Sequence, residues 1–321
     1  MIKKILLFAL CLLGSINVFA QTYTNEIGVE SDNDSYLLRK SDNYYTDGIF
    51  VYYNHALAVD ANSALQNKIL GFEAGQKIFN PQSGSINYYG FDDPGYIDRP
   101  FAAYLYVGST LNFLYKDESN LKLGAQIGMI GPSAYGKQVQ DYVHHLLGFY
   151  QPEGWEYQID NNAVLNLSAE YNRLLARASW VDVSVSAYGN LGNGFSGAGI
   201  GPLLRLGIFN QLFNSISTQS SVSRSSATPL HKYELFFYYK PQFNYVAYDA
   251  TIQGGLFTTH NPNSMEVTSD PSRIIWSNQL GATYSCGRIS IDIAAIYHTK
   301  DTEEMINPHQ WGTITGFYRF N

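Results

Sequence analysis

His144 is the residue in this sequence that is best suited to acid–base chemistry. Residues 137–148 are predicted to form a short helix after the strand-ending pair Gly131-Pro132. Gln140 and His144 would share one face of that helix, because they are four residues apart. A histidine titrates near neutral pH and can take a proton from water. Since a lone surface histidine is usually inert, this interpretation depends on what lies beside it.

Oxygen-bearing side chains are concentrated near the start of the chain, in segments 32–36 (DNDSY) and 42–48 (DNYYTDG). Calcium prefers hard oxygen donors of this kind. The spacing is not that of an EF-hand, because Leu37 stands where that loop requires glycine. Asx-rich segments also form simple turns in which side chains cap their own backbone, so the residues alone leave both interpretations open.

Two other side chains could contact a ligand. Arg99 follows Asp98, and the two could form an ion pair that ties a loop to its neighbours. Alternatively, the planar guanidinium of Arg99 could bind an anionic headgroup, because its geometry matches phosphate. Trp155 is expected to anchor the chain at a membrane interface and to contact substrate there.

Other reaction classes find little support in the sequence. There is no Gly-x-Ser-x-Gly elbow, no phosphate-binding glycine-rich loop and no paired-cysteine metal site. Histidines elsewhere in the chain show no clustering comparable to that around His144; they are His231, His260, His298 and His309.

The first twenty residues indicate export. A short positive region, an apolar core too short to span a bilayer and a small-residue cleavage site follow one another in residues 1–20, as in a removable signal peptide. Residues 21–321 would then form the mature chain. Its single cysteine, Cys286, cannot form an internal disulfide.

Composition favours a membrane-embedded β protein. Hydrophobic residues make up 45% of the chain and charged residues only 15%, with 26 Tyr and 18 Phe. Tyrosine suits the aromatic belts at membrane interfaces, although a secreted, Tyr-rich β-sandwich would also fit. The net charge of −7 argues against a nucleic-acid partner, because no basic surface is expected to neutralise phosphates.

Alternation of apolar and polar residues recurs in segments of about ten residues, which is typical of membrane-spanning strands. No later stretch reaches the roughly eighteen apolar residues of a transmembrane helix. The candidate strands are 24–33, 45–58, 67–79, 101–115, 119–131, 161–174, 178–190, 200–212, 232–243, 246–258, 274–285, 288–299 and 310–320.

Thirteen strands do not suit a single-chain bacterial barrel, which has an even number. Merging 232–258 into one long, Pro-bent strand gives an all-β, antiparallel transmembrane barrel of about twelve strands. Segments 259–273 and 300–309 then lie outside, and 213–231 becomes a long periplasmic link.

With an even number of strands and both termini at the periplasmic end, three polar segments lie at the same external rim. They are 32–46, 80–100 and 132–160. His144 and its predicted external helix would therefore lie beside the carboxylate-rich segment. A histidine in that position is well placed to act as a general base near pH 7.

Together these segments resemble the lipid A 3′-O-deacylase family of outer-membrane proteins, often called LpxR-like. The resemblance covers most of the mature chain in strand order and spacing. It implies a twelve-stranded outer-membrane barrel that needs Ca²⁺ and removes the ester-linked 3′ acyl chain of lipid A. The similarity is densest in Asn33-Asp34, Tyr45 to Gly48, Gln76 to Pro81, Asp98 to Pro100, Gly131 to His144, His309, Gly312 and Phe317 to Phe320.

The resemblance assigns roles to individual residues. Asn33 and Asp34 match the family's Asn-Asp pair, implicated in the metal and active site, and Thr46 matches the hydroxyl residue of its Tyr-Thr-x-Gly motif. Gln140 and His144 match the Gln and the essential His of the external helix. His144 would deprotonate water, Ca²⁺ held partly by Asp34 would polarise the ester carbonyl, and Asn33 or Thr46 would stabilise the oxyanion.

Two departures from the family pattern concern the substrate and metal contacts. The founding enzymes carry Glu six residues after the His, whereas this chain has Tyr150, with Glu153 as a candidate substitute. The family's basic Lys-Arg element has no counterpart, because 82–97 contains neither residue.

Two alternative functions stay open at this point. One is a deacylase or lipase for another outer-membrane lipid, and the other is a non-catalytic barrel that serves as a small channel or a structural protein. The expected partners are lipid A or lipopolysaccharide of the outer leaflet and the membrane itself. Because a closed barrel has no free edges, we expect a monomer.

Overall fold

The computed structural model describes most of the expected mature chain. The described residues are 23–37, 42–82, 87–88, 91–92, 94–225, 227–258 and 262–321. The predicted signal peptide, residues 1–20, and His260 lie outside them.

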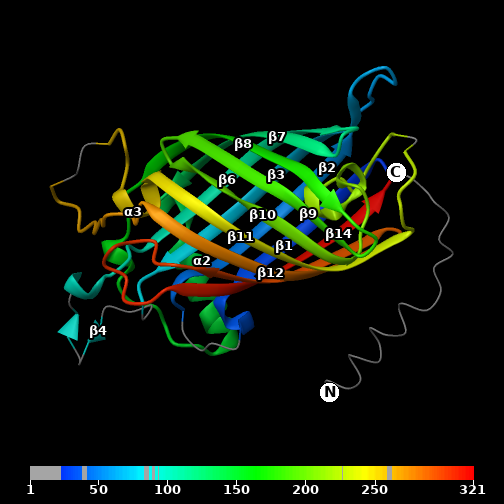
Figure 1. Cartoon of the computed structure of the whole chain (residues 1–321). Coiled ribbons are helices and arrows are strands. Elements are labelled where there is room, and N and C mark those ends of the chain that lie inside the picture. The colour runs from blue at the N-terminus through cyan, green and yellow to red at the C-terminus, as the bar shows by residue number, and fades with distance from the viewer. Residues whose placement is uncertain are drawn as a thin grey trace.

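Twelve antiparallel strands close into one barrel, which confirms the predicted fold class (Figure 1). Neighbours in sequence are neighbours in the wall, and β1 closes the barrel against β14. The strands are β1 (Asn25–Asn33), β2 (Tyr44–Ala56), β3 (Leu65–Asn80), β6 (Ala102–Tyr115), β7 (Ser119–Ile130), β8 (Asn162–Arg177), β9 (Val181–Gly192), β10 (Phe195–Ile208), β11 (Tyr233–Asp249), β12 (Ile274–Cys286), β13 (Ile289–His298) and β14 (His309–Phe320).

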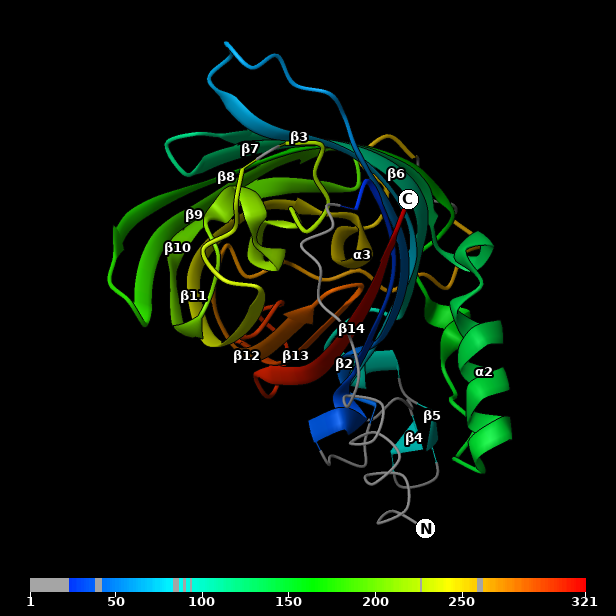
Figure 2. The same cartoon turned by 90° about the vertical axis from the view of Figure 1, so that its right-hand side faces the viewer.

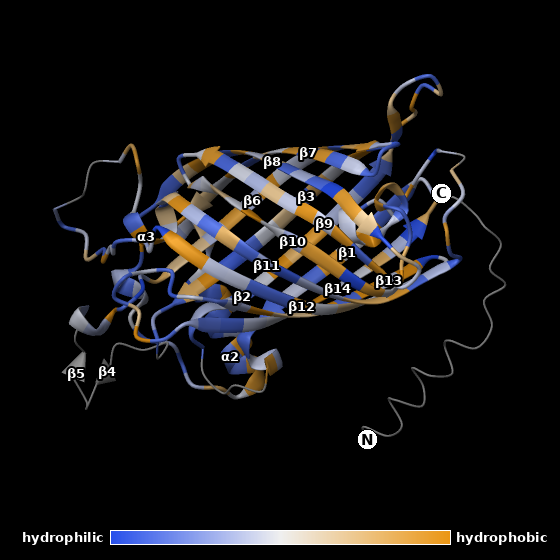
Figure 3. Cartoon of the chain, viewed as in Figure 1, coloured by the Kyte–Doolittle hydropathy of each residue, from blue (hydrophilic) through white to orange (hydrophobic). Residues whose placement is uncertain are grey.

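The two-residue period of the strands separates an apolar outside from a polar inside. In β1, Ile27 and Val29 point outward and are about half exposed, whereas Glu26 is completely buried in the interior. Figure 3 shows apolar and polar residues alternating along the strands of the wall.

Most of the short elements gather at one end of the barrel. Residue 24 and the C-terminus meet at the other end, where Thr24 N donates to Asn321 Oδ1 at 3.0 Å. The first end carries α2 (Gly136–Leu147), α3 (Ala250–Gln253), η1 (Asp34–Leu37) and the small hairpin of β4 (Asn87–Tyr88) and β5 (Phe91–Asp92) (Figures 1 and 2). Long loops are extracellular in outer-membrane barrels, so this is the extracellular end. The prediction that segments 32–46, 80–100 and 132–160 meet at one end of the barrel is confirmed for their described residues.

None of the helices in the described part of the chain has the length and hydropathy needed to cross a bilayer. The predicted helix at 137–148 is confirmed as α2, which is only 12 residues long.

Two strand boundaries differ from the sequence prediction by five residues or more. The predicted strand 232–258 is one strand, as expected, but β11 ends at Asp249, whose side chain accepts from Thr251 N at 2.8 Å and so begins α3. β10 starts at Phe195 rather than at residue 200. Its first half is rich in glycine, which hides the alternation; at Gly201 a Cβ would lie 1.9 Å from the carbonyl oxygen of Pro241.

The predicted periplasmic link folds back into the barrel as a plug, which we define as the described residues of 209–232. It carries η5 (Leu212–Asn214) and η6 (Ile216–Thr218), and Figure 2 looks into the end that it covers. Side chains of the wall hold its backbone: Asn112 Nδ2 donates to Thr218 O and Asn67 Nδ2 to Val222 O, each at 2.8 Å. Two plug hydroxyls bind buried carboxylates of the wall: Ser215 Oγ donates to Glu234 Oε1 at 2.7 Å, and Ser221 Oγ donates to Glu26.

Arg205 anchors the plug to the wall. Its side chain is completely buried and binds both carboxylate oxygens of Asp182, at 2.9 and 2.6 Å. The same guanidinium donates to the plug at Ser215 Oγ (2.8 Å) and Asn210 O (3.1 Å).

We predict that Arg205→Leu destabilises the barrel by about 3 kcal/mol or more, because it leaves buried acceptors without their donor. Chemical unfolding of the protein refolded in detergent measures this. The control Arg173→Leu changes an exposed arginine of β8 and should leave the unfolding midpoint nearly unchanged. Equal midpoints for the two variants would contradict the role given to Arg205.

Candidate active site on the outer face of the barrel

A β-bulge shapes the extracellular tip of β2. Tyr45 pairs with Phe79 of β3 and Asp47 pairs with Ile78, so Thr46 has no partner in this register. The extra residue lets Tyr45 line the luminal cavity while Asp47 turns to the outer face. Thr46 is completely buried between them. Bulges often re-aim a side chain in this way beside functional sites.

Asn33 and Asp47 face each other across β1 and β2 on the outer face. Asn33 Nδ2 donates to Asp47 Oδ1, and Asn33 Oδ1 accepts from Ser35 N at 2.8 Å. The latter bond turns the chain into η1, whose first residue is Asp34. Asp34 is 3% exposed, and its Oδ2 accepts from Asn43 N at 2.9 Å.

Helix α2 covers this part of the wall from outside. It can pack closely because a Cβ at Gly136 would lie 2.4 Å from the Cβ of Ala103 in β6. It ends at Gly148, which adopts a left-handed φ of 71° and donates its N–H to His144 O. Gln140 and His144 are both buried, which confirms that they share the inward face of the helix.

Trp155 holds Gln140 in place. The indole is 1% exposed, packs against Phe101 with ring centroids 5.3 Å apart, and donates from Nε1 to Gln140 Oε1 at 2.9 Å. The prediction that Trp155 anchors the chain at the membrane interface is wrong, because this side chain lies beneath the loop and helix instead of at the surface. Since Gln140 Oε1 accepts from the indole, its amide nitrogen is the group left to face Asp42.

Three polar groups converge on one oxygen of Asp42. His144 Nε2 lies 2.8 Å from Asp42 Oδ2, the Tyr150 hydroxyl donates to it at 2.8 Å, and Gln140 Nε2 donates at 3.3 Å. Asp42 therefore connects the β1–β2 segment to α2 and to the loop that follows it.

The hydrogen bonds of His144 define its tautomer. Its Nδ1 lies 2.5 Å from the carbonyl oxygen of Tyr150, which can only accept, so Nδ1 carries a proton. Nε2 is then the nitrogen that can exchange a proton, and it points toward Asp42. The ring is 3% exposed and contacts Phe149 and Tyr150 edge-on, at 5.6 and 5.0 Å between centroids.

The carboxylates of this site repel one another. Burial raises the pKa of Asp34 to about 8, and the nearby charges of Asp42 and Asp47 contribute to the increase. Burial and the neighbouring Asp42 likewise raise the pKa of Tyr150. A dication bound among these oxygens would relieve the repulsion, so the donor set fits calcium. Asp34 and Asn33 are the predicted ligands, and Asp42 and Asp47 are the further carboxylates at hand.

Most of the predicted site residues come together. Asn33, Asp34, Gln140 and His144 meet at the outer face, and Thr46 lies directly before Asp47. Sequence reasoning did not single out Asp42 and Asp47 as site residues, although both lie in the oxygen-rich segment that it described. The only indication in the sequence was the high number of Asp and Asn residues in that segment. That number does not show which of these residues belong to the site.

Arg99 is not part of this group. Its side chain is 1% exposed, stacks over Phe79 at 4.0 Å and donates to Thr251 Oγ1 at 3.1 Å. It lines the luminal cavity rather than the outer face. Burial lowers the pKa of Arg99, while Asp301 and Asp249 beside it act in the opposite direction.

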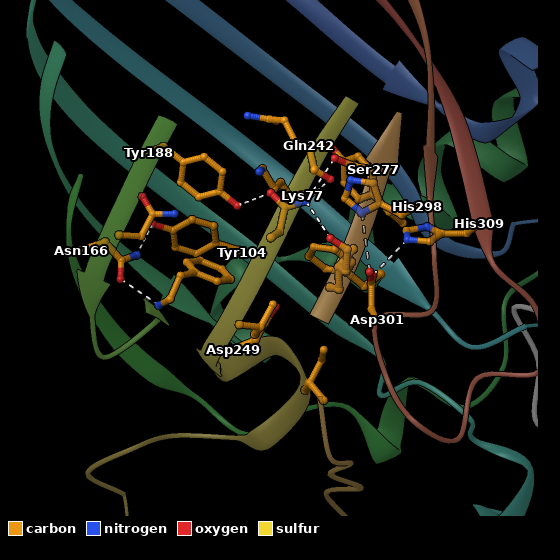
Figure 4. Close-up of a pocket in the computed structure, with 18 of the residues that line it drawn as sticks. Lys77, Tyr104, Asn166, Tyr188, Gln242, Asp249, Ser277, His298, Asp301 and His309 are labelled. Atoms are coloured by element: carbon orange, nitrogen blue, oxygen red, sulfur yellow. Dashed lines mark hydrogen bonds and ion pairs between the residues drawn. The ribbon is translucent and has the colours of Figure 1, made fainter. Parts of the chain in front are cut away.

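A second polar group lies inside the barrel (Figure 4). His298 and His309 face Asp301 there, which corrects the prediction that these histidines show no clustering. The group borders a cavity of about 480 Å³ on the luminal side of the wall.

A family model described as outer membrane protein LpxR matches residues 6–320. Among solved structures, LpxR from Salmonella typhimurium is similar, with 20% sequence identity and a TM-score of 0.72 over 92% of this chain and 100% of that chain. The beta domain of the Bordetella autotransporter BrkA is 11% identical over 94% and 100% of the two chains, with a TM-score of 0.48. No curated protein sequence matches this chain. The similarity to the Salmonella structure supports the barrel fold.

We predict that Asp34→Asn weakens the pH dependence of stability when a chelator is present. The pKa of Asp34 is about 8 in the folded protein and ordinarily 3.8. The stability associated with its proton is therefore complete below about pH 4 and is lost as the pH rises through about 8. Thermal unfolding between pH 5 and 9 should show a smaller loss for Asp34→Asn than for the wild type. Asp60→Asn, in an exposed turn, is the control; identical pH profiles for all three proteins would contradict the buried, protonated state of Asp34.

Proposed function

This chain belongs to the LpxR family of outer-membrane proteins, and we propose that it is a calcium-dependent lipid A 3′-O-deacylase. In this reaction water attacks the carbonyl carbon of the ester that links the 3′ acyl chain to the sugar. The observation that carries the proposal is the position of His144, whose Nε2 lies 2.8 Å from Asp42 Oδ2 beside Asn33, Asp34 and Asp47 at the outer face.

The surroundings of the site suit a lipid that approaches sideways from the outer leaflet. Helix α2 and the segment just after it carry large apolar side chains that are mostly exposed: Tyr142 is 69% exposed, Leu146 68% and Phe149 53%. On the wall below, Ile49 and Val51 of β2 point outward and are each 54% exposed. The acyl chains of a substrate could contact this surface while its ester reaches the polar group above.

His144 is the general base of the proposed reaction. With Nδ1–H donated to Tyr150 O, the lone pair of Nε2 can accept a proton from water as the water oxygen bonds to the carbonyl carbon. The same proton then passes to the sugar oxygen as the ester C–O bond breaks. The products are a free fatty acid and a sugar hydroxyl. The Asp42 carboxylate stabilises the imidazolium that forms between the two steps.

Calcium fits the oxygen donors that surround His144. Asp34 and Asn33 would hold it, and when bound it supplies positive charge that polarises the ester carbonyl. At the position where the founding enzymes carry Glu, this chain has Tyr150. We propose that Asp42 provides the missing carboxylate, because the Tyr150 hydroxyl donates to Asp42 at 2.8 Å.

The other residues position these groups. Gln140 is a positioning residue, since it is held by Trp155 and donates to Asp42. Asn33 and Thr46 are the candidates for an additional oxyanion donor, and removing such a donor typically costs about a hundredfold or more in rate.

Of the alternative functions, a deacylase for another outer-membrane lipid would use the same site and differs only in substrate. A channel is less well supported, because the plug of residues 209–232 occupies the periplasmic end of the lumen. Its contacts with Asn67 and Asn112 fix it to two strands of the wall.

We predict that His144→Ala lowers the rate of 3′ deacylation by about 10²–10⁴-fold, because water loses its base. The measurement is the mass spectrum of lipid A extracted from an outer membrane that contains the protein, with and without calcium. His145→Ala is a matched control, since His145 is the exposed neighbour on the same helix. Unchanged lipid A from the correctly folded wild type would contradict the proposed function, and loss of another acyl chain would favour the alternative substrate.

We predict that Asp42→Asn raises the calcium concentration needed for half-maximal activity by about tenfold or more, because the site loses one carboxylate. Adding Tyr150→Glu to this variant should restore part of the calcium response by returning the charge beside the same position. If Asp42→Asn leaves the calcium response unchanged, Asp42 is not a ligand. If Asp42→Asn abolishes activity at every calcium concentration and Tyr150→Glu has no effect, Asp42 acts only through its contact with His144.

A further inference from the structure

His298, Asp301 and His309 lie together at the extracellular end of the lumen (Figure 4). His298 is the last residue of β13 and His309 the first of β14, and the two are partners in the register of these strands. Asp301 lies in the loop between them and turns back toward both rings. A hairpin thus brings two imidazoles and one carboxylate to the same place.

The distances suit a small cation. Asp301 Oδ2 lies 3.1 Å from His309 Nε2, and Asp301 Oδ1 lies 3.6 Å from His298 Nδ1. The three ligand atoms all lie within 4.8 Å of one another. Tetrahedral coordination with bonds of about 2.0–2.2 Å places ligand atoms about 3.4 Å apart. The two separations from Asp301, one from each carboxylate oxygen, are close to this value, and the His298 and His309 ligand atoms lie within 4.8 Å of each other.

His309 provides a separate indication that something binds here. It is 3% exposed, its Nδ1 has no hydrogen-bond partner among the described residues, and its Nε2 lies near Asp301 at 3.1 Å. Buried polar atoms are rarely left in that condition. Its Nε2 points toward Asp301 across the group, as a ligand to a shared ion would.

The charges nearby do not exclude a cation. Arg99 Nε lies 3.9 Å from Asp301, but Arg99 also faces Asp249 and Asp98, so several carboxylates surround one guanidinium.

We propose that His298, Asp301 and His309 bind a divalent transition-metal ion such as Zn²⁺. Two imidazoles and one carboxylate favour zinc, cobalt or nickel over calcium, which prefers oxygen ligands. A fourth position faces the luminal cavity, where water can complete the coordination. This site is separate from the outer-face site and does not depend on the proposed function.

Bound metal would stiffen the extracellular end of the wall. The loop that carries Asp301 also binds Asp98, through Thr302 Oγ1 to Asp98 O (2.7 Å) and Ile306 N to Asp98 Oδ2 (3.1 Å). Asp98 in turn accepts from the Tyr44 hydroxyl at 2.7 Å, and Tyr44 is the first residue of β2, two residues before Thr46. The luminal group is therefore connected to the strand that carries the outer-face site.

The test is Co²⁺ binding to the folded barrel in detergent, with Asp34→Asn and His144→Ala present so that the outer site does not contribute. After treatment with a chelator, one Co²⁺ per chain should bind with the visible absorption of tetrahedral cobalt, and excess calcium should not displace it. Adding His298→Ala should weaken binding by about 100-fold or more. His231→Ala, outside the group, is the matched control and should bind as before.

A second measurement keeps the test independent of folding in the variants. Zn²⁺ should raise the unfolding temperature of the background protein but not that of the His298→Ala protein, because a ligand stabilises only the state that binds it. Absence of Co²⁺ binding at micromolar concentrations would overturn the proposal. So would binding that His298→Ala and Asp301→Asn leave unchanged.

Discussion

In hydrocarbon no water is available to hydrogen-bond the backbone, so every strand of the wall has to be paired on both sides. The β1–β14 pairing meets this requirement by joining the two ends of the chain, from Asn25 opposite Phe320 to Asn33 opposite Gly312. Closure then fixes which side chains face lipid and which face the lumen, because the strand period is two. Polar chemistry on the outer face is confined to the extracellular tips of the strands, above the apolar surface.

The candidate site lies at these extracellular strand tips. A bulge at Thr46 turns Asp47 outward beside Asn33, and α2 closes over the same tips from outside. The helix brings His144 to Asp42 at 2.8 Å, while Trp155 and Gln140 set the orientation of the contacts. The site is thus assembled from the first and third external segments of the chain, on the outer face of the wall. The interior is instead occupied at its periplasmic end by the plug, which leaves a separate luminal cavity near the other end.

Much of the wall was predictable from the sequence, because alternation and parity are properties of single strands and of their number. The glycine-rich start of β10 and the end of β11 at Asp249 were not, since glycine carries no hydropathy signal and a helical cap needs only one side chain. Trp155 was misplaced because an aromatic residue at a rim has the same sequence signature whether a helix covers it or not. The pairing of His298 with His309 depends on strand register and on the return of Asp301, which no local pattern in the sequence contains. Asp42 could not be distinguished from the neighbouring Asp and Asn residues, because the contacts that mark it come from α2 and the loop that follows.

The central claim is that water, activated by His144, attacks the acyl carbonyl of lipid A at the outer face. The most direct measurement is a reaction of the purified barrel with lipid A and calcium in water enriched in ¹⁸O, followed by mass spectrometry of both products. We expect one ¹⁸O in the carboxylate of the released 3′ fatty acid and none in the sugar hydroxyl left behind. Label in the sugar, or no released fatty acid from a folded and calcium-loaded protein, would contradict it.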